Sequence, residues 1–497
     1  MTDLQPCLDA IRAAPPGPQV GAFFDYDGTL IDGYSAAAYF TDRVRRGEAG
    51  AAEILRMLQL ARGPDPTDDE FATIVTDGMA PWIGHREADL AERWAGLFKS
   101  SIAGWLFPEG YRLVREHVKA GHTVVIASSA TRYQLEPVAR EYGIEHLLYT
   151  RLGVRRGIIS GKLEGRPPWG AGKAVAVRAF ADAQAVDLAQ SFGYANGNED
   201  IDFLDAVGNP TAINPKPLLA THAGQLAWPR LEFPARRRAP WSAWAGTVGM
   251  YAAWAGAFGL GYALDKITGD TRRAVDLIGS VGSEVGLAAA GIRMEVHGEH
   301  NLWSHRPAVF ILNHQSKLEF LLFPVLVRRG LTGVAKAEAA KVPGFGHFMR
   351  MADFAFLDRD NTRSAVDALA PAVERLRRGL SVAMAPEGTR SYSPKLGSFK
   401  KGAFRLAMQA QVPIVPVVFR NSAELMPRNA QLIRGGTAQV MVLDPIDVSG
   451  WKPETLEQHI AEVRQRYVDT LDNWPGGNPT APPPARWVAK AEELHHE

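Results

Sequence analysis

The sequence has almost no cysteine and almost no net charge. Its single cysteine, Cys7, excludes an internal disulfide framework and fits a reducing compartment. The chain has 55 Lys and Arg residues and 54 Asp and Glu residues. It therefore lacks the net positive charge that would indicate a nucleic-acid partner. The first residues lack a long apolar run, and we therefore expect no secretory signal. At 497 residues the chain is too long for one core, which predicts two or three domains.

One stretch lacks charged side chains altogether. The segment from Trp241 to Leu264, "WSAWAGTVGMYAAWAGAFGLGYAL", is rich in Ala and Gly, with Trp and Tyr scattered through it. Its length is enough to span a bilayer, but Trp and Tyr favour the membrane interface. We expect membrane contact rather than a single spanning helix. A buried core helix and a dimerisation surface are the alternatives.

Apolar strand-like runs alternate with helical sequence in both halves of the chain. The first half contains "VGAFFDYDG", "TVVIA" and "SFGYAN", and the second contains "AVFILNH", "FAFLD", "LSVAMAPEG", "VPIVPVVF" and "AQVMVLD". This alternation predicts α/β domains with parallel sheets covered on both faces. The Pro- and Arg-rich stretch "WPRLEFPARRRAP" predicts a linker between the halves.

Two aspartates close the first strand of the N-terminal half. Asp25 and Asp27, in "FFDYDGTL", are two positions apart and therefore point to the same side of an extended chain. The carboxyl ends of strands in an open α/β sheet are where ligands bind. Two carboxylates there can serve as nucleophile and general acid, or can share a divalent cation. A strand-terminal Asp turn would explain one aspartate more readily than two.

Three further segments extend this pattern: "TVVIASSA" with Ser128, "GKAVAVRAF" with Lys173, and "GYANGNEDIDFLDAVGNP" with Asp200. In this order the set resembles the haloacid dehalogenase-like phosphatases, and within them the phosphoserine-phosphatase-like branch with a helical cap. The resemblance implies a Rossmann-like fold and Mg²⁺ as cofactor. It further implies roles for the residues: Asp25 as nucleophile, Asp27 as acid/base, Ser128 and Lys173 as phosphate ligands, and Asp25, Asp27, Asn196 and Asp200 around the metal.

Asn196 is the departure from that family. The family usually has Gly-Asp where this chain has Ala195 and Asn196. An amide oxygen can still bind Mg²⁺ but brings no charge, so we expect weaker metal affinity. The N-terminal domain is accordingly expected either to hydrolyse a phosphomonoester or to act as a ligand-binding or assembly module.

The C-terminal half carries a histidine and a carboxylate in "AVFILNHQSKLEF". His314 and Glu319 are five positions apart, which is about 140° on an ideal helix, so they can meet only if His314 precedes the helix. A carboxylate that orients an imidazole forms the base half of a catalytic triad, in which a substrate hydroxyl takes the place of serine. A capping Glu beside a satisfied histidine is the alternative.

Three more blocks follow in order: "FLDRD" with Arg359, "PEGTRS" with Glu387, Gly388, Thr389 and Arg390, and "VPIVPV". Together the four blocks resemble the glycerolipid acyltransferases that acylate 1-acylglycerol-3-phosphate. The resemblance implies that Arg390 and Arg359 bind phosphate, with Lys336, Glu387, Gly388 and Thr389 contributing to the substrate site. Solvent-exposed lysine is an equal alternative for Lys336.

The resemblance implies direct transfer of an acyl group from acyl-CoA or acyl carrier protein to the sn-2 hydroxyl, with His314 as base and no metal. The family has Asp where this chain has Glu319, and one methylene moves the carboxylate by about 1 Å. Lysophospholipid and acyl thioester would be substrates, nucleic acid is not expected, and a homodimer is possible. The cytoplasmic face of the cell membrane is the expected location, with peripheral or monotopic attachment. A lipid-binding scaffold with two degraded sites is the non-enzymatic alternative.

These patterns predict a domain order. We expect an N-terminal helix and linker at 1–19, the phosphatase-like domain at 20–222 with a cap at about 34–116, a linker at 223–240, apolar membrane-associating helices at 241–295, the acyltransferase domain at 296–450, and a helix and Pro-rich tail at 451–497.

Overall fold

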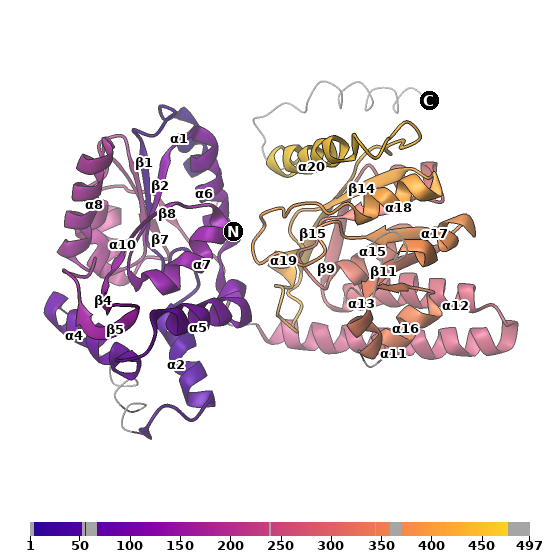
Figure 1. Cartoon of the computed structure of the whole chain (residues 1–497), viewed down its shortest axis with the longest axis horizontal. Helices are drawn as coiled ribbons and strands as arrows, with labels where there is room; N and C mark the ends of the chain where they lie inside the picture. Colours follow the sequence, from indigo (N-terminus) through magenta and orange to yellow (C-terminus); the bar gives the residue numbers. More distant parts are fainter. Residues whose placement is uncertain are drawn as a thin grey trace. The chain divides into compact units, whose positions relative to one another are not determined.

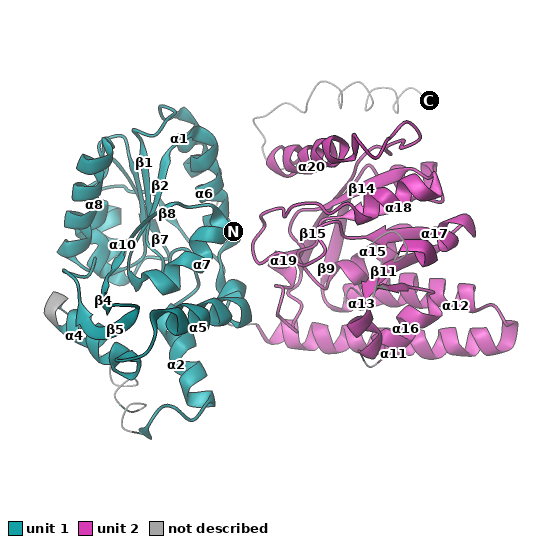
Figure 2. Cartoon of the chain, in the orientation of Figure 1, with its two compact units in different colours: residues 1–238 teal, residues 239–497 magenta. Residues whose placement is uncertain are grey.

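The computed structural model describes residues 4–51, 55, 67–237, 240–342, 344–357 and 369–475. The chain divides into two compact units, Met1–Arg238 and Ala239–Glu497, which Figure 2 colours separately. Each unit is built on its own largely parallel sheet, so the predicted two-domain α/β architecture is confirmed. The predicted final helix, "RWVAKAEELHHE", lies outside the described residues.

Unit 1 is built around a six-stranded sheet in the order β3-β2-β1-β6-β7-β8, in which every pairing is parallel. The strands are β1 Gly21–Phe24, β2 Thr123–Thr131, β3 His146–Thr150, β6 Phe192–Ala195, β7 Asn209–Ile213 and β8 Arg230–Leu231. All four residues of β1 are buried, as expected of a central strand covered on both faces. Figure 1 shows helices on both sides of this sheet, with α8 on one side and α6 on the other.

The helices of unit 1 fall into two groups. Those near the sheet are α1 Gln5–Ala13, α6 Pro108–Ala120, α7 Arg132–Tyr142, α8 Ala171–Gln184, α9 Ile201–Leu204 and α10 Pro217–Gln225. Between β1 and β2 lie α2 Ser35–Arg45, α4 Asp68–Met79, η1 Ala80–Trp82, α5 Glu87–Ser100 and η2 Ile102–Trp105, and a hairpin of β4 Leu152–Arg155 and β5 Ile158–Leu163 contacts this group. Helix α6 starts with Pro108, and Gly121, whose φ of +76° suits glycine, caps it after Ala120.

Unit 2 is built around a seven-stranded sheet in the order β12-β11-β13-β10-β14-β15-β9. The strands are β9 Ile292–His297, β10 Val309–Leu312, β11 Leu331–Lys336, β12 Ala355–Leu357, β13 Ser381–Met384, β14 Ile414–Phe419 and β15 Gly436–Val442. Only β14 and β15 pair antiparallel among the described strands of this sheet. Because β10 lies between β13 and β14, the segments that follow β10 and β13 emerge side by side at one edge.

The helices of unit 2 cover both faces of its sheet. They are α11 Trp241–Thr268, α12 Thr271–Leu277, the π-turn η4 Ile278–Gly282, α13 Ser283–Ala289, α14 Asn301–Ser304, α15 Glu319–Val327, η5 Ala337–Lys341, α16 Phe345–Met351, α17 Ala370–Arg377, α18 Gly402–Ala410, α19 Ser422–Leu425 and α20 Leu456–Asp472. One core joins α17, α18 and α20 to the sheet, and a second joins α13 and α15 to its opposite face.

The charge-free segment forms α11, which packs against η4 and α13. Its small residues face this contact: a Cβ added to Gly246 would lie 3.0 Å from Cα of Ala290, and one added to Gly261 would lie 2.5 Å from Cγ1 of Ile278. Glycine therefore permits close helix packing within the protein. In the part of the chain that the structure describes, no helix combines the length and hydropathy needed to cross a bilayer. The expected membrane association of residues 241–295 stays a prediction.

Candidate active sites

The turn after β10 sets the position of His314. Asn313 is buried, and its side-chain amide donates to the carbonyl of Phe419 at 2.8 Å and accepts from the Phe419 amide at 2.7 Å. These two bonds hold the strand end against β14. His314 therefore leaves the sheet in a defined direction, ahead of α15.

His314 and Glu319 meet as the sequence predicted. Nδ1 of His314 lies 2.5 Å from Oε2 of Glu319, the first residue of α15. The other oxygen of Glu319 accepts from the amides of Gln315 and Ser316 at 2.8 and 2.9 Å and from the hydroxyl of Ser422 at 2.5 Å. A carboxylate accepts only, so Nδ1 carries the ring proton and Nε2 presents a lone pair. Among the described residues, none bonds to Nε2.

The carboxylate of Glu387 holds the neighbouring loops together. Its Oε1 accepts from the amide of His314 at 2.7 Å, and its Oε2 accepts from the amide of Gly397 at 2.7 Å. Burial raises the pKa of this carboxyl, while the two amides act in the opposite direction. The side chain therefore fixes the backbone at His314. The substrate contact expected for Glu387 stays a prediction.

Arg390 contacts a residue that the sequence motifs did not indicate. Nη1 of Arg390 donates to the carbonyl of Arg428 at 2.5 Å, and Nη1 of Arg428 donates back to the carbonyl of Arg390. Arg428 also donates to the hydroxyl of Thr389 at 3.3 Å, and its guanidinium lies 3.9 Å from the centre of the Tyr392 ring. Arg428 follows α19 in a loop with no motif of its own, so only the fold brings it here.

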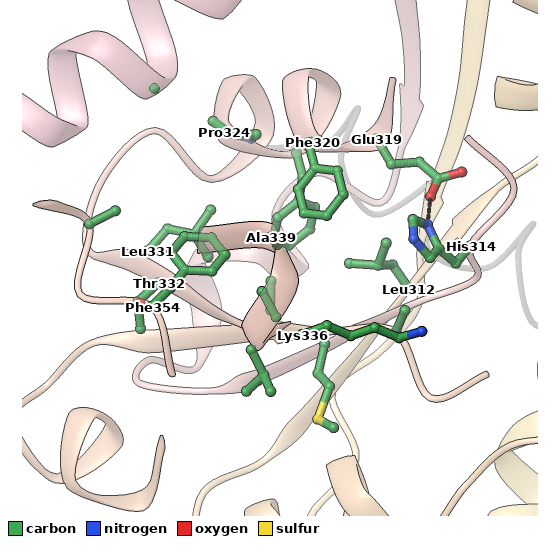
Figure 3. A pocket seen from close by; sticks show the side chains of 18 of the residues that line it. Leu312, His314, Glu319, Phe320, Pro324, Leu331, Thr332, Lys336, Ala339 and Phe354 are labelled. Atoms are coloured by element: carbon green, nitrogen blue, oxygen red, sulfur yellow. Dashed lines mark hydrogen bonds and ion pairs between the residues drawn. The ribbon is translucent and has the colours of Figure 1, made fainter. Parts of the chain in front are cut away.

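A cavity of about 820 Å³ connects these groups. Its polar lining comprises Arg272, Asp276, Ser280, His314, Glu319, Arg328, Thr332, Lys336, Glu338, Thr389, Arg390, Lys400 and Arg428, and Gly388 lines it as well. Its apolar lining includes Phe320, Phe323, Leu331, Phe345, Phe348 and Phe354. In Figure 3, His314 and Glu319 lie at one side of the pocket, and Leu331, Thr332 and Phe354 gather at the other. The pocket therefore has the His314–Glu319 pair at one side and apolar surface at the other, where the Arg272–Asp276 ion pair also lies beside Leu331.

Most of the predicted residues of this half converge on the cavity. His314, Glu319, Lys336, Gly388, Thr389 and Arg390 line it. Gly388 has a φ of +70°, which explains the glycine in "PEGTRS". Lys336 is the last residue of β11, and in Figure 3 its amino end is directed toward the His314 side of the pocket. Arg359 lies outside the described residues, and its role stays a prediction.

In unit 1, a buried lysine joins two aspartates. Asp25 follows β1, and Nζ of Lys173 lies 2.8 Å from Oδ1 of Asp25 and 2.5 Å from Oδ1 of Asp200. All three residues are at least 94% buried. Burial alone would lower the pKa of Lys173, but Asp200 and Asp25 together raise it. Burial raises the pKa of Asp25 to about 7, against the pull of Lys173. Lys173 is thus a permanent cation beside Asp25.

Asp27 faces the start of α2 rather than Lys173. Its carboxylate accepts from the amide of Ser35 at 2.7 Å and from the Ser35 hydroxyl at 3.2 Å, and that hydroxyl accepts from Gln134 at 2.8 Å. Burial raises the pKa of Asp27 to about 6, with Ser35 opposing the shift. The two aspartates therefore sit in different surroundings, as a nucleophile and a proton donor would require.

The predicted metal residues are hard oxygen donors, the kind that Mg²⁺ prefers. The hydroxyl of Thr29 lies 3.4 Å from Oδ2 of Asp25 and 3.4 Å from Oδ1 of Asn196, so these two oxygens approach one point. Asp200 is committed to Lys173 and to the amide of Gly197. Within the described ranges, no three His, Cys, Asp or Glu residues are grouped to hold a metal. The donor set fits Mg²⁺ in kind, and Asp25 and Asn196 share the Thr29 hydroxyl as a neighbour.

Ser128 lies within β2 and is buried. Its hydroxyl accepts from the amide of Ala130 at 3.3 Å. Its predicted phosphate contact stays a prediction.

Each half of the chain is similar to a known protein family. Residues 293–420 match the family model for acyltransferases, and residues 22–205 match that for haloacid dehalogenase-like hydrolases. The 1-acyl-sn-glycerol-3-phosphate acyltransferase of Saccharomyces cerevisiae is 36% identical over 200 residues, which are 39% of this chain and 66% of the relative. The chain spans slightly less than two thirds of the length of the curated relatives that it matches.

Solved structures are similar to each half. The crystal structure of the 1-acyl-sn-glycerophosphate acyltransferase PlsC from Thermotoga maritima is 25% identical, with a match that covers 46% of this chain and 96% of that one and a TM-score of 0.40. A substrate-bound phosphoserine phosphatase is 16% identical, with coverage of 43% and 92% and a TM-score of 0.33.

Proposed function

We propose that this chain, in which an acyltransferase domain follows a haloacid dehalogenase-like domain, transfers an acyl group from a thioester of CoA or acyl carrier protein to the sn-2 hydroxyl of 1-acylglycerol-3-phosphate. The product is phosphatidic acid. The observation that carries this proposal is the His314–Glu319 pair, which opens on a cavity that also contains Arg390. The sequence relatives bear names of the same reaction.

The geometry supports His314 as the base. Its Nε2 presents a lone pair to the cavity and can take the proton from the sn-2 hydroxyl, while buried Glu319 stabilises the imidazolium that forms. The hydroxyl oxygen then attacks the thioester carbonyl, and a C–O bond replaces the C–S bond. His314 returns the proton to the departing thiolate. This sequence needs no acyl-enzyme intermediate.

The two ends of the cavity match the two ends of the acceptor. Arg390 can bind the phosphate through a charge-assisted fork, and Lys336 adds a second cation from β11. Phe320, Phe345 and Phe348 offer apolar surface for an acyl chain, and their rings contact one another. The substrate would therefore lie with its phosphate near Arg390 and its hydroxyl near His314.

The exposed side of α11 supports attachment to a membrane surface. Trp241 and Leu260 are 82% and 68% exposed, and Trp244, Val248 and Tyr251 are exposed with them. No charged residue occurs in α11 before Asp265. Exposed Trp and Tyr on such a face favour the interfacial region of a bilayer. We infer peripheral docking at the cytoplasmic face of the cell membrane, where the lipid acceptor resides.

The acyl-transfer proposal is tested by product analysis. The full chain would be incubated with anionic vesicles that contain 1-acylglycerol-3-phosphate and, in separate reactions, acyl-CoA or acyl carrier protein. We expect phosphatidic acid with the new chain at sn-2, detected by mass spectrometry. Absence of that product with both donors would overturn the proposal.

Replacement of Trp244, Val248 and Tyr251 by Ser should weaken vesicle co-sedimentation; unchanged binding would contradict α11 docking.

For unit 1, the buried Asp25–Lys173–Asp200 group and the separate setting of Asp27 favour phosphomonoester hydrolysis. Asp25 would attack phosphorus, and Asp27 would protonate the leaving oxygen. Mg²⁺, held by Asp25, Asn196 and Asp200 with Asp27 near, would supply charge neutralisation. Mg²⁺-dependent phosphate release that Asp25→Asn removes would support this activity. Absence of release from a panel of phosphomonoesters would leave a ligand-binding or assembly module.

A further inference from the structure

The loops that carry Arg390 and Arg428 are fastened to each other by their own arginines. Each guanidinium donates to the backbone carbonyl of the other residue, so each side chain fixes the loop that presents its neighbour. Arg428 is fixed again by Thr389 and by the face of Tyr392. Both arginines line the cavity that contains His314.

Across the described ranges, neither Arg390 nor Arg428 forms an ion pair with Asp or Glu. Burial, followed by the charge of Arg428, lowers the pKa of Arg390, while the charge of Glu319 acts in the opposite direction. Lys317 adds a third charge nearby, and its pKa is lowered by burial and then by Arg390. Glu319 offsets part of this positive charge, and the part that is not offset is costly in a half-buried site unless an anion joins it.

The arginines also retain donors for such an anion. A guanidinium has five N–H groups, and in the bonds among the described residues Arg390 uses one nitrogen and Arg428 uses two. The remaining N–H groups belong to two rigid, planar forks at one cavity wall. Such a pair suits a tetrahedral anion with two charges better than an anion with one.

We propose that Arg428 is a second phosphate-binding residue, which with Arg390 forms a clamp that selects a phosphate monoester dianion over a singly charged phosphodiester headgroup. The lipid identity of the ligand rests on the proposed acyltransferase function. The anion site itself rests on the paired arginines and the cavity they line.

The first experiment compares acceptor kinetics in Arg428→Gln, Arg428→Lys and the wild type, with Arg466→Gln on the exposed side of α20 as control. Gln removes the charge and is too short to reach the Arg390 carbonyl, whereas Lys keeps the charge without the planar fork. A lost charge-assisted bond predicts a rise of about ten- to a hundredfold in KM for lysophosphatidate. We expect KM for acyl-CoA to stay within twofold. In Arg428→Gln, the preference for lysophosphatidate over lysophosphatidylglycerol should fall by a similar factor. Arg428→Lys should restore part of the affinity for lysophosphatidate and part of this preference.

Two kinetic outcomes would overturn the proposal. One is an acceptor KM within twofold of the wild type in Arg428→Gln. The other is an equal rise in KM for both substrates without any change in headgroup preference, because that result would indicate a purely structural role.

The second experiment does not depend on turnover or on a variant. The wild-type chain is modified with phenylglyoxal, and labelled arginines are quantified by peptide mass spectrometry. We expect inorganic phosphate and lysophosphatidate each to protect both Arg390 and Arg428, whereas zwitterionic lysophosphatidylcholine should not, and Arg466 should react in every sample. Protection of Arg390 alone would contradict the clamp. Protection of the two arginines by inorganic phosphate but not by lysophosphatidate would contradict it as well. Protection of both arginines in a protein that forms no phosphatidic acid would retain the anion site and reject the acyl-transfer reaction.

Discussion

Oε2 of Glu319 lies 2.5 Å from Nδ1 of His314, although the two residues would face different sides of a continuous helix. The contact forms because α15 begins at Glu319 and His314 lies in the preceding loop. The amides of Gln315 and Ser316 turn inward over the same carboxylate. The side chain of Glu319 is thus accommodated by the loop.

Replacement of Glu319 by Asp should impair the enzyme. The shorter side chain withdraws the carboxylate by about 1 Å from His314, from the loop amides, or from both, and a displacement of that size can cost about a hundredfold in rate. We expect kcat for acyl transfer to fall by about ten- to a hundredfold. The exposed Glu462→Asp variant is the matched control. Full activity in Glu319→Asp would show that the observed contact is not needed.

Asn196 provides a test of the metal site in unit 1. Its Oδ1 lies 3.4 Å from the Thr29 hydroxyl that also approaches Asp25. Replacement by Asp adds a charged oxygen at this point, and we expect Mg²⁺ to bind about tenfold more tightly. Isothermal titration calorimetry measures this directly, with Asn473→Asp in unit 2 as control. Equal or weaker binding would place the metal away from residue 196.

Two buried histidines predict acid sensitivity of unit 1. The carbonyl of Pro15 accepts from Nε2 of His122 at 3.1 Å, which leaves Nδ1 of His122 to accept from Nδ1 of His117 at 2.8 Å. Nε2 of His117 then accepts from the hydroxyl of Tyr194 at 2.9 Å. A proton added to Nδ1 of His122 would place two N–H groups face to face, and a proton added to Nε2 of His117 would require the Tyr194 hydroxyl to turn and accept. Burial, and then His122, lowers the pKa of His117 well below its ordinary value.

The sign of the pH effect follows from that lowered pKa. Below pH about 6.5 His117 takes up a proton in the unfolded chain but not in the folded one. The contribution of neutral His117 to the free energy of unfolding is therefore complete above this pH and declines below it. The free energy of unfolding falls by about 1.4 kcal/mol for each pH unit below this value. Hydrogen exchange at the amides of Gly17 and Thr123, which join the N-terminal linker to α6 and β2, should show lower protection factors at pH 5.5 than at pH 7.5.

His117→Gln should flatten this dependence, and exposed His305→Gln should leave it intact. Constant protection in the wild type between the two pH values would refute the histidine account.

The sequence predicted those parts of the molecule that depend on short segments. Apolar runs indicated the strands, and the positions of Asp25 and His314 directly after such runs placed them at the edges of two parallel sheets. The segment "HQSKLE" allowed the His314–Glu319 contact on the condition that His314 precedes the helix, as it does. In each case the residues involved are neighbours in the chain or are ordered by sheet topology.

The remaining features depend on contacts between distant segments. Arg428 lies in a loop without a motif, and only the arrangement of β13 and β14 around β10 brings it to Arg390. The carboxylate of Glu387 accepts from two backbone amides, and because every residue type except proline has such an amide, the sequence does not reveal these contacts. The glycines of α11 allow the helix to pack closely against η4 and α13. The amino-acid composition alone could not distinguish this role from helix packing in a lipid bilayer.

The central claim is that the imidazole of His314 removes the acceptor proton. Its most direct test is the initial rate of phosphatidic acid formation by His314→Ala relative to the wild type, on vesicles with lysophosphatidate and the active thioester donor. Circular dichroism and vesicle binding would confirm that the variant is folded and docked. We predict a loss of about a thousandfold at unchanged fold and binding. A rate within tenfold of the wild type would contradict the assignment of His314 as the base.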